Sequence, residues 1–281
     1  MNFQRVLHTQ QILSGKSIAI YEYESDGESG TVLFPPAMAV RQHFYRHYAS
    51  YLAQLGYRTY TFDYSGVGKS RHQHPRKSRI QLVDWIAEIA EVGDWVKQRD
   101  DPDRYYYITH SLGGQFFGLL DNPHIFDAMI SITSQNGYWR FYRQKYSYFF
   151  FWYFLAPFLY QTLGYFPGSK VGMGVDLPKA VMQQWKRWCT SENYFFDDDV
   201  PQTKNFEKFD GPLLTLSFGD DPWATKEAVD DLVMHYTSAQ VDHRHILPKE
   251  VELEEIGHFG FFLPENHILW KITTSWMRNL G

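Results

Sequence analysis

The sequence has little cysteine and no excess of positive charge. Cys189 is the single cysteine, so the chain cannot form an internal disulfide framework. Its 27 Lys and Arg against 32 Asp and Glu give a formal net charge of −5, which argues against nucleic-acid binding through a broad basic field. The first residues show no apolar signal segment, which predicts a cytoplasmic protein. Aromatic residues, by contrast, are abundant: 22 Phe, 20 Tyr and 9 Trp among 281 residues predict an unusually aromatic surface or cavity.

The first part of the chain alternates between two kinds of pattern. Short β-branched or aromatic runs predict strands, and longer segments with apolar residues at helical spacing predict helices. Strand and helix alternating in this way indicate βαβ units and a mostly parallel sheet, an α/β fold. The expected strands cover residues 18–21, 31–34, 58–62, 105–109, 213–218 and 241–247. One expected helix begins at Arg41 and is stopped by Gly56, and the others cover 80–96, 115–120, 226–235 and 266–277.

The alternation stops after Ser134 and resumes at Pro212. We therefore expect a core in two parts, residues 1–134 and 206–281, separated by an inserted helical cap over residues 135–205. Within the insertion, the 24 residues from Tyr146 to Ser169 carry no charge and are long enough to span a bilayer. They include two prolines, two glycines and five tyrosines, which favours an aromatic cap over a transmembrane helix.

A candidate nucleophile lies between a predicted strand and a predicted helix. The segment Thr109-His110-Ser111-Leu112-Gly113-Gly114 approximates the G-x-S-x-G nucleophile elbow, with Thr109 in place of the first glycine. Such an elbow exposes the serine hydroxyl above the sheet, and the N–H groups that open the next helix face a developing anion. The pattern therefore predicts Ser111 as a nucleophile, although a helix start that merely contains glycine would look the same.

A serine nucleophile needs a base, and the base needs a carboxylate that orients it. Asp220 and Asp221 directly follow the strand expected at 213–218, and His258 lies between the last strand and the last helix. The order Ser, Asp, His along the chain is that of α/β-hydrolases. Three such residues in loops after strands make a stronger signal than the serine alone, and either aspartate satisfies the pattern.

With these residues in place, the whole chain resembles the α/β-hydrolase superfamily. In detail it is similar to an uncharacterised bacterial group of predicted serine hydrolases. The resemblance is carried by F-P-P-A-M, F-D-Y-S-G-V-G-K-S, H-S-L-G-G-Q, N-G-Y-W-R, Q-W-K-R-W-C, S-F-G-D-D-P-W-A and I-G-H-F-G-F-F. It implies an α/β-hydrolase fold with Ser111 as nucleophile, His258 as general base, and Asp221 rather than Asp220 as the acid because it precedes Pro222.

The chain departs from many relatives where they carry His-Gly before the first oxyanion residue. Here the segment is Pro35-Pro36-Ala37-Met38, and proline has no N–H to donate. We expect the Met38 and Leu112 N–H groups to form the oxyanion hole, with Ala37 as the equivalent of the glycine. We also expect Ala37, His110, Tyr138 and Trp139 to contact the substrate, the last two as a wall of an apolar acyl pocket.

Two other patterns are weaker. Gly66-Val67-Gly68-Lys69-Ser70 looks like the end of a phosphate-binding loop but lacks its first glycine and a following helix, which favours a structural turn. His43 and His47 are spaced as metal ligands can be, but no neighbouring Glu or third ligand accompanies them.

The leading hypothesis is a serine hydrolase that cleaves a carboxylic ester or thioester of a lipophilic or aromatic acyl group. It needs no metal or organic cofactor, and its partner is a small acyl substrate. Acyl transfer, amide hydrolysis and C–C bond hydrolysis by the same residues stay open, as do a non-catalytic binding module and a lipid-surface protein with peripheral membrane contact through the aromatic cap. The sequence does not indicate an oligomeric state.

Overall fold

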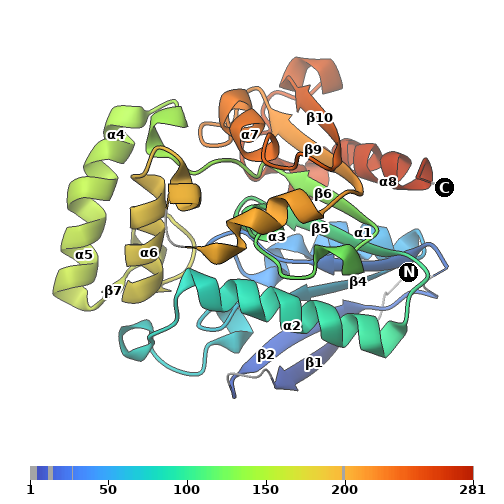
Figure 1. Cartoon of the computed structure of the whole chain (residues 1–281), viewed down its shortest axis with the longest axis horizontal. Coiled ribbons are helices and arrows are strands. Elements are labelled where there is room, and N and C mark those ends of the chain that lie inside the picture. The colour runs from blue at the N-terminus through green and yellow to red at the C-terminus, as the bar shows by residue number, and fades with distance from the viewer. Residues whose placement is uncertain (1–4, 12–14, 27, 198–199, 281) are drawn as a thin grey trace.

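The computed structural model describes residues 5–11, 15–26, 28–197 and 200–280. Its centre is an eight-stranded sheet (Figure 1), in which β1 and β2 run antiparallel to their neighbours and the other strands are parallel. The strand order is β1-β2-β4-β3-β5-β6-β9-β10. The strands are β1 (Arg5–Gln11), β2 (Ser17–Tyr23), β3 (Gly30–Phe34), β4 (Tyr57–Phe62), β5 (Tyr105–His110), β6 (Ala128–Ile132), β9 (Pro212–Phe218) and β10 (Gln240–Ile246). The mostly parallel α/β sheet predicted from the sequence is confirmed.

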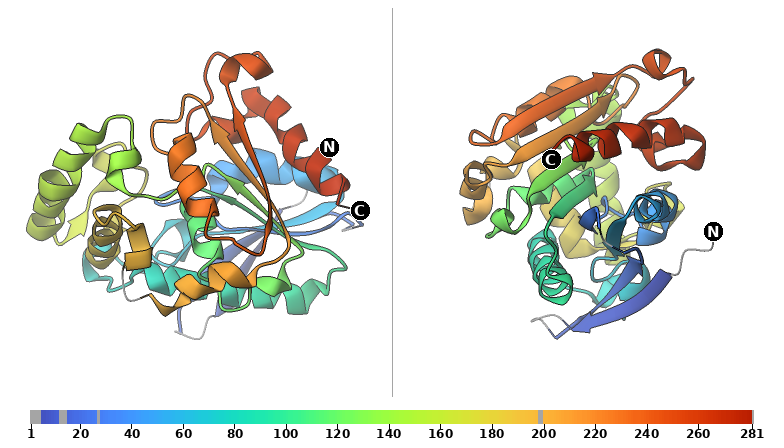
Figure 2. Two further views of the ribbon diagram at one scale, coloured as in Figure 1. Left: turned by 45° about the horizontal axis from the view of Figure 1, so that its top comes forward. Right: turned by 90° about the vertical axis from the view of Figure 1, so that its right-hand side faces the viewer.

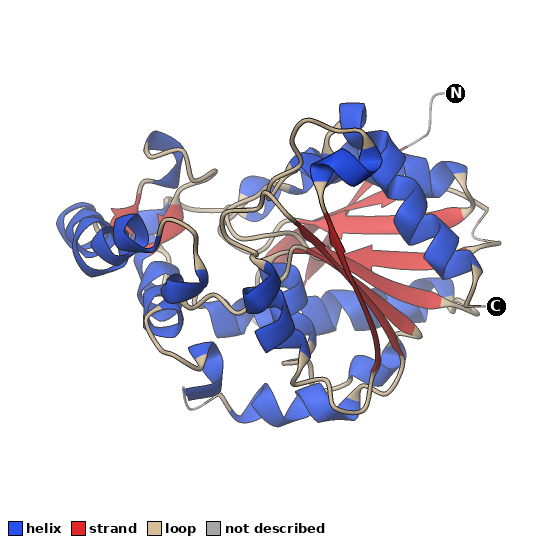
Figure 3. Cartoon of the chain, turned by 90° about the horizontal axis from the view of Figure 1, so that it is seen from above, coloured by secondary structure: helices blue, strands red, loops and turns tan. Residues whose placement is uncertain are grey.

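The sheet is buried on both faces because its central strands are almost wholly apolar or aromatic. Every residue of β3, β5 and β6 is buried, as expected of parallel strands that are covered on two sides. One core cluster joins this sheet to α2 (Leu82–Asp100) and α3 (Leu112–Phe117), and a second joins its other face to α1 (Arg46–Gln54) and α8 (Trp270–Arg278). Seen from above, the helices lie on both sides of the strands (Figure 3). The remaining core helix is α7 (Lys226–Val233).

Between β6 and β9 the described residues add no strand to the central sheet. It forms α4 (Lys145–Phe150), a π-helical turn (Phe151–Leu155), α5 (Ala156–Leu163) and α6 (Lys179–Cys189), with a small sheet of β7 (Tyr165–Phe166) and β8 (Leu177–Pro178). This part projects to one side of the sheet, with α4 and α5 outermost and α6 between them and the core (Figures 1 and 2). Among the described residues, no helix combines the length and the apolar character needed to cross a bilayer.

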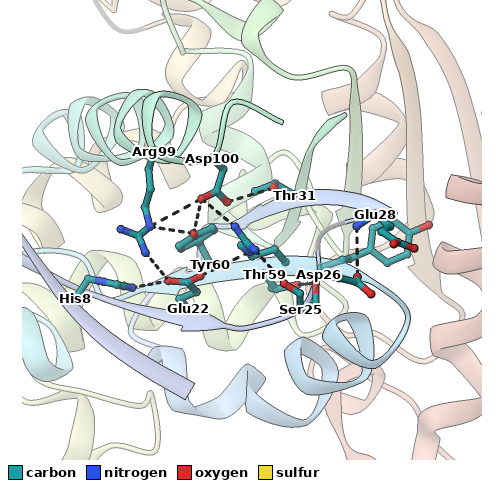
Figure 4. Close-up of polar contacts among 12 residues, drawn as sticks. His8, Glu22, Ser25, Asp26, Glu28, Thr31, Thr59, Tyr60, Arg99 and Asp100 are labelled. Carbon is teal, nitrogen blue, oxygen red and sulfur yellow. Dashed lines mark hydrogen bonds and ion pairs between the residues drawn. The ribbon is translucent and has the colours of Figure 1, made fainter. Parts of the chain in front are cut away.

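A polar network joins β1 and β2 to the end of α2 (Figure 4). Glu22 contacts His8 at 2.6 Å and Arg99 at 3.2 Å, and the neighbouring Asp100 accepts a hydrogen bond from Tyr60 at 2.9 Å. Arg58, near the start of β4, lies 3.5 Å from Asp100. The charges therefore compensate one another at the amino ends of the parallel strands, away from the loops that follow those strands.

Candidate active site

The candidate nucleophile lies on a strained turn between β5 and α3. Ser111 has φ 51° and ψ −115°, a backbone conformation that residues other than glycine rarely adopt and that is typical of a nucleophile elbow. Its N–H donates to the Ile132 carbonyl of β6 at 2.9 Å, which fixes the turn to the sheet. A Cβ atom on Gly113 would lie 2.7 Å from the Pro35 carbonyl oxygen, and glycine avoids this contact. The elbow is therefore built by close approach of α3 to the loop after β3.

Thr109 occupies the place of the first glycine of the elbow pattern without crowding the turn. Its hydroxyl donates to the Pro35 carbonyl at 2.9 Å, so the side chain ties β5 to the loop after β3. Thr109 is fully buried, and the missing side chain of Gly113 leaves the space that it uses. The departure from the usual pattern is thus compensated by a hydrogen bond across the same loop.

Asp221 and His258 form a buried pair on neighbouring loops. One Asp221 carboxylate oxygen lies 2.7 Å from His258 Nδ1, and the other accepts hydrogen bonds from the N–H groups of Trp223 and Ala224 at 2.8 and 2.9 Å. Asp220 points elsewhere, because its carboxylate accepts the Ile256 N–H at 2.8 Å. Asp220 therefore braces the loop that leads to His258, while Asp221 contacts the imidazole itself.

The surroundings of Asp221 keep it ionised. Burial alone would raise the pKa of its carboxyl, but the His258 ring and the two backbone N–H donors outweigh burial and hold that pKa below its ordinary value. An anionic Asp221 accepts a hydrogen bond from a protonated His258 Nδ1. The unprotonated Nε2 can then accept a proton from another group. Ser111 and His258 are 8% and 7% exposed, so the approach to both side chains is narrow.

His110 does not face an open cavity but lies inside a hydrogen-bonded chain. Its Nε2 lies 2.9 Å from the His258 carbonyl oxygen, its Nδ1 lies 3.0 Å from the Tyr45 hydroxyl, and that hydroxyl accepts the Ala37 N–H at 2.9 Å. A carbonyl only accepts, so Nε2 carries the proton and Nδ1 accepts from Tyr45. Burial lowers the pKa of His110 well below its ordinary value, which keeps the ring neutral as these hydrogen bonds require. The hydrogen bonds from Ala37 through Tyr45 and His110 to His258 join the loop after β3 to the loop that carries His258.

The N–H groups of Ala37, Met38 and Leu112 differ in whether they already have a hydrogen-bond partner. The Ala37 N–H is engaged by Tyr45, whereas among the described residues no partner is found for the Met38 N–H. Leu112 is the first residue of α3, so its N–H has no partner within the helix. Both N–H groups therefore stay the predicted donors to an oxyanion.

Two aromatic residues that were not predicted as site residues, Trp223 and Phe259, lie next to the His258 ring. The Trp223 ring lies 4.8 Å and the Phe259 ring 5.2 Å from the His258 ring, measured between centroids. Tyr148 of α4 contacts Trp223 by a hydrogen bond, so the insertion reaches the acid loop. Trp223 lies two positions after Asp221 and Phe259 directly follows His258, and this closeness in sequence could have identified both as site residues.

The predicted pocket residues Tyr138 and Trp139 lie just after β6. Trp139 packs against Phe149 of α4 with ring centroids 5.4 Å apart, and Arg140 lies over both predicted rings. None of the contacts found for these two residues is with Ser111, Asp221 or His258. Their place is therefore at the base of the insertion, and a role in substrate binding stays a prediction.

The other candidates from the sequence are structural. Asp63 accepts hydrogen bonds from the Gln42 and Lys69 N–H groups at 2.8 and 2.9 Å, so the Gly66–Ser70 segment closes on Asp63. Cys189 is buried, and burial raises the pKa of its thiol well above the ordinary value. Within the described part of the chain, no group of three or more His, Cys, Asp and Glu side chains is arranged to hold a metal ion.

A cavity of about 460 Å³ lies away from the candidate site. It is lined by side chains such as Lys16, Ser65, His72 and Arg79, and it includes neither Ser111 nor His258. The chemistry of the Ser111 region therefore cannot be assigned to this cavity.

Comparisons with known proteins agree with this fold. Residues 30–167 match the family model described as alpha/beta hydrolase fold. A soluble variant of monoglyceride lipase from Saccharomyces cerevisiae has a TM-score of 0.71 and 12% identity, covering 99% of this chain and 96% of that one. An esterase from Pyrococcus furiosus has a TM-score of 0.65 and 12% identity, with coverages of 99% and 91%.

A thioesterase domain from the curacin biosynthetic pathway is also similar. It has a TM-score of 0.60 and 14% identity, covering 97% of this chain and 99% of that one. No curated protein sequence matches the chain. The family model, the topology of the sheet and these structural neighbours together show that the chain has the alpha/beta hydrolase fold.

Proposed function

We propose that this protein is a serine hydrolase that cleaves a carboxylic ester or thioester with a lipophilic or aromatic acyl group. The observation that carries the proposal is the buried Asp221–His258 pair, 2.7 Å apart, on a loop whose His258 carbonyl lies 2.9 Å from Nε2 of His110, the residue before the strained elbow at Ser111. That combination supplies an oriented base and a nucleophile on an elbow, which are the parts needed for acyl transfer through an acyl-enzyme. The esterase, thioesterase and lipase among the structural neighbours support the same class of reaction.

The proposed reaction begins when His258 Nε2 takes the proton of Ser111 as its oxygen attacks the acyl carbon. Asp221 holds the imidazole tautomer and stabilises the imidazolium that forms. The N–H groups of Met38 and Leu112 stabilise the oxyanion, and His258 then gives its proton to the departing alcohol or thiol. Water, activated by His258 in the same way, releases the acid from Ser111.

The lipophilic preference rests on the aromatic surroundings of His258. Trp223 and Phe259 flank its ring, and the aromatic insertion reaches Trp223 through Tyr148. Apolar walls with few polar groups favour an apolar acyl chain because binding removes both surfaces from water. Tyr138 and Trp139, at the base of the insertion, are proposed to extend this wall.

The test combines a fluorophosphonate probe with p-nitrophenyl esters of increasing acyl length. We expect the wild type to be labelled and to prefer medium or long chains over acetate. Ser111→Ala removes the nucleophile, so labelling should vanish and kcat should fall by about 10⁴-fold or more. Ser134→Ala, a buried serine beside α3, is the matched control and should keep both.

Two outcomes contradict separate parts of the proposal. Labelling that persists in Ser111→Ala would remove the nucleophile assignment. A kcat/KM that is highest for acetyl esters and falls steadily with chain length would remove the lipophilic preference, while the serine chemistry would stand.

A further inference from the structure

The outer side of the insertion is apolar where a soluble helix is normally polar. From Lys145 to Leu163, α4, the π-helical turn and α5 follow one another without interruption. The inner side is packed through Trp152, Ala156 and Tyr160, which are at most 4% exposed. The outer side carries six large aromatic residues that are 41–81% exposed, and we call them the outer aromatic face: Tyr146, Phe149, Phe150, Tyr153, Phe154 and Phe158.

Four of these rings pack against one another, and Tyr146 and Phe158 lie one helical turn before and after them. Phe149 lies 4.7 Å from Tyr153, and Phe150 stacks on Phe154 at 5.6 Å, measured between ring centroids. Given the size of aromatic side chains and these exposures, the outer aromatic face presents on the order of 700 Å² to solvent. That exceeds the largest apolar patch of a typical monomeric protein, about 300–600 Å², and such a patch marks an interaction site.

The charge around this face is opposite to that of the rest of the chain. Residues 138–190 contain seven Lys or Arg and one acidic residue, Asp176, whereas the remainder contains 20 Lys or Arg and 31 Asp or Glu. Lys145 lies 5.9 Å from the Tyr146 ring and Lys186 lies 5.6 Å from the Tyr153 ring. Cations therefore border the aromatic rings directly.

Exposed aromatic rings bordered by cations indicate which kind of partner covers the outer aromatic face. Two copies of the chain that met through this face would bring the same cations together, which is unfavourable. An anionic lipid surface instead accepts the rings at the depth of its headgroups and attracts the cations. We propose that the outer aromatic face docks the protein on an anionic bilayer, with the helix lying in the interface and the acidic remainder of the chain held away.

The docked helix adjoins the candidate active site from its other side. Tyr148, on the inner side of α4, contacts Trp223, whose ring packs on His258. The Arg143 N–H donates to the Pro222 carbonyl at 3.0 Å, which fixes the start of this segment to the acid loop. A single helix would thus separate the lipid from the catalytic residues, and this last step rests on the proposed function. Docking itself does not depend on it.

The test measures sedimentation with vesicles and uses Ser111→Ala protein so that hydrolysis does not alter the lipid. One vesicle is phosphatidylcholine alone, and the other mixes phosphatidylcholine and phosphatidylglycerol in about a two-to-one ratio. We expect strong binding to the anionic vesicle only. Phe150→Ser combined with Phe158→Ser should weaken that binding at least tenfold, and Lys145→Gln with Lys186→Gln should reduce the preference for anionic lipid.

A matched control removes exposed apolar residues elsewhere on the chain. Met234→Ser with Ile268→Ser changes side chains that are 67% and 47% exposed, outside the insertion, and should leave vesicle binding unchanged. The proposal is overturned when the control weakens binding as much as the phenylalanine pair, or when the parent protein ignores anionic vesicles. It is also overturned when sedimentation velocity shows a dimer that Phe150→Ser with Phe158→Ser dissociates, since a second copy then covers the face.

Vesicle binding and fluorophosphonate labelling fail independently of each other. Loss of labelling with intact vesicle binding would remove the proposed hydrolase and keep the docking surface. Intact labelling without vesicle binding would do the reverse.

Discussion

The core and the insertion use aromatic residues in opposite ways. Tyr45, Tyr48, Tyr105 and Tyr107 of the core are fully buried, and each hydroxyl has a hydrogen-bond partner. The outer aromatic face of the insertion is instead exposed and consists mainly of phenylalanine. The abundant aromatic residues therefore serve two purposes: hydrogen-bonded tyrosines tie elements of the core together, and exposed rings form an apolar outer surface.

Two of these buried tyrosines, Tyr107 and Tyr45, hold parts of the candidate site. Tyr107 donates to the Gly113 carbonyl at 2.7 Å and so supports α3, while Tyr45 accepts from Ala37 and supports the loop after β3. Burial raises the pKa of Tyr107 well above its ordinary value, so the hydroxyl stays protonated and donates throughout the working pH range. Chemistry belongs to the core in this interpretation, and contact with an interface belongs to the insertion.

The largest expected effect tests whether the chemistry belongs to the core. Asp221→Asn keeps the size of the side chain but offers His258 Nδ1 an amide, which permits the wrong tautomer. We expect kcat for a p-nitrophenyl ester to fall by about 10⁴-fold, as in other triads. Asp220→Asn is the control, because Asp220 contacts the Ile256 N–H rather than His258, and its kcat should fall by less than about tenfold. The opposite ranking would transfer the acid role to Asp220.

Most of the fold was predictable because its strands are strongly patterned. Except for β6, for which the sequence analysis gave no range, the parallel strands read as short apolar or aromatic runs and form within a few residues of the expected positions. β1 was missed because its residues alternate between exposed and half-buried positions at the edge of the sheet, so Arg5–Gln11 shows no apolar run. The helix expected at 115–120 begins at Leu112 instead, because a single residue, Ser111, separates the end of β5 from the start of α3.

The candidate site was predictable only where residue order carries it. Ser111, Asp221 and His258 follow the order of a known triad, and their placement after strands could be read from the sequence. The hydrogen bonds that link Ala37, Tyr45 and His110 could not be predicted from the sequence. Tyr45 has the spacing of an ordinary helix residue and lies 65 positions from His110. His110 was expected at the substrate, whereas the structure encloses it with both ring nitrogens hydrogen-bonded.

A second prediction compares the two kinds of aromatic residue by their effect on stability. Phe126 is 3% exposed and packs on Tyr105 and Tyr107, so Phe126→Ala should lower the free energy of unfolding by about 3–5 kcal/mol. Phe158 is 65% exposed, and Phe158→Ala should change it by less than about 0.5 kcal/mol. Urea denaturation of both variants measures the difference. A large loss for Phe158→Ala would mean that the outer aromatic face packs against something in the folded protein.

The smallest effect concerns a single buried hydroxyl. Tyr45→Phe leaves the Ala37 N–H and His110 Nδ1 without a partner, which loosens the loop that carries Met38 and the carbonyl of His258. We expect kcat to fall about tenfold, equivalent to 1.4 kcal/mol of transition-state stabilisation, with KM unchanged. Tyr48→Phe is a matched control, since Tyr48 is equally buried but its hydroxyl contacts Thr273 of α8 at 2.8 Å. Each variant should lose about 1–3 kcal/mol of unfolding free energy, because each leaves buried polar groups unpaired. Equal kcat values for the two variants would show that the Tyr45 hydroxyl only stabilises the fold, whereas a loss confined to Tyr45→Phe would assign it to positioning the oxyanion loop and His258.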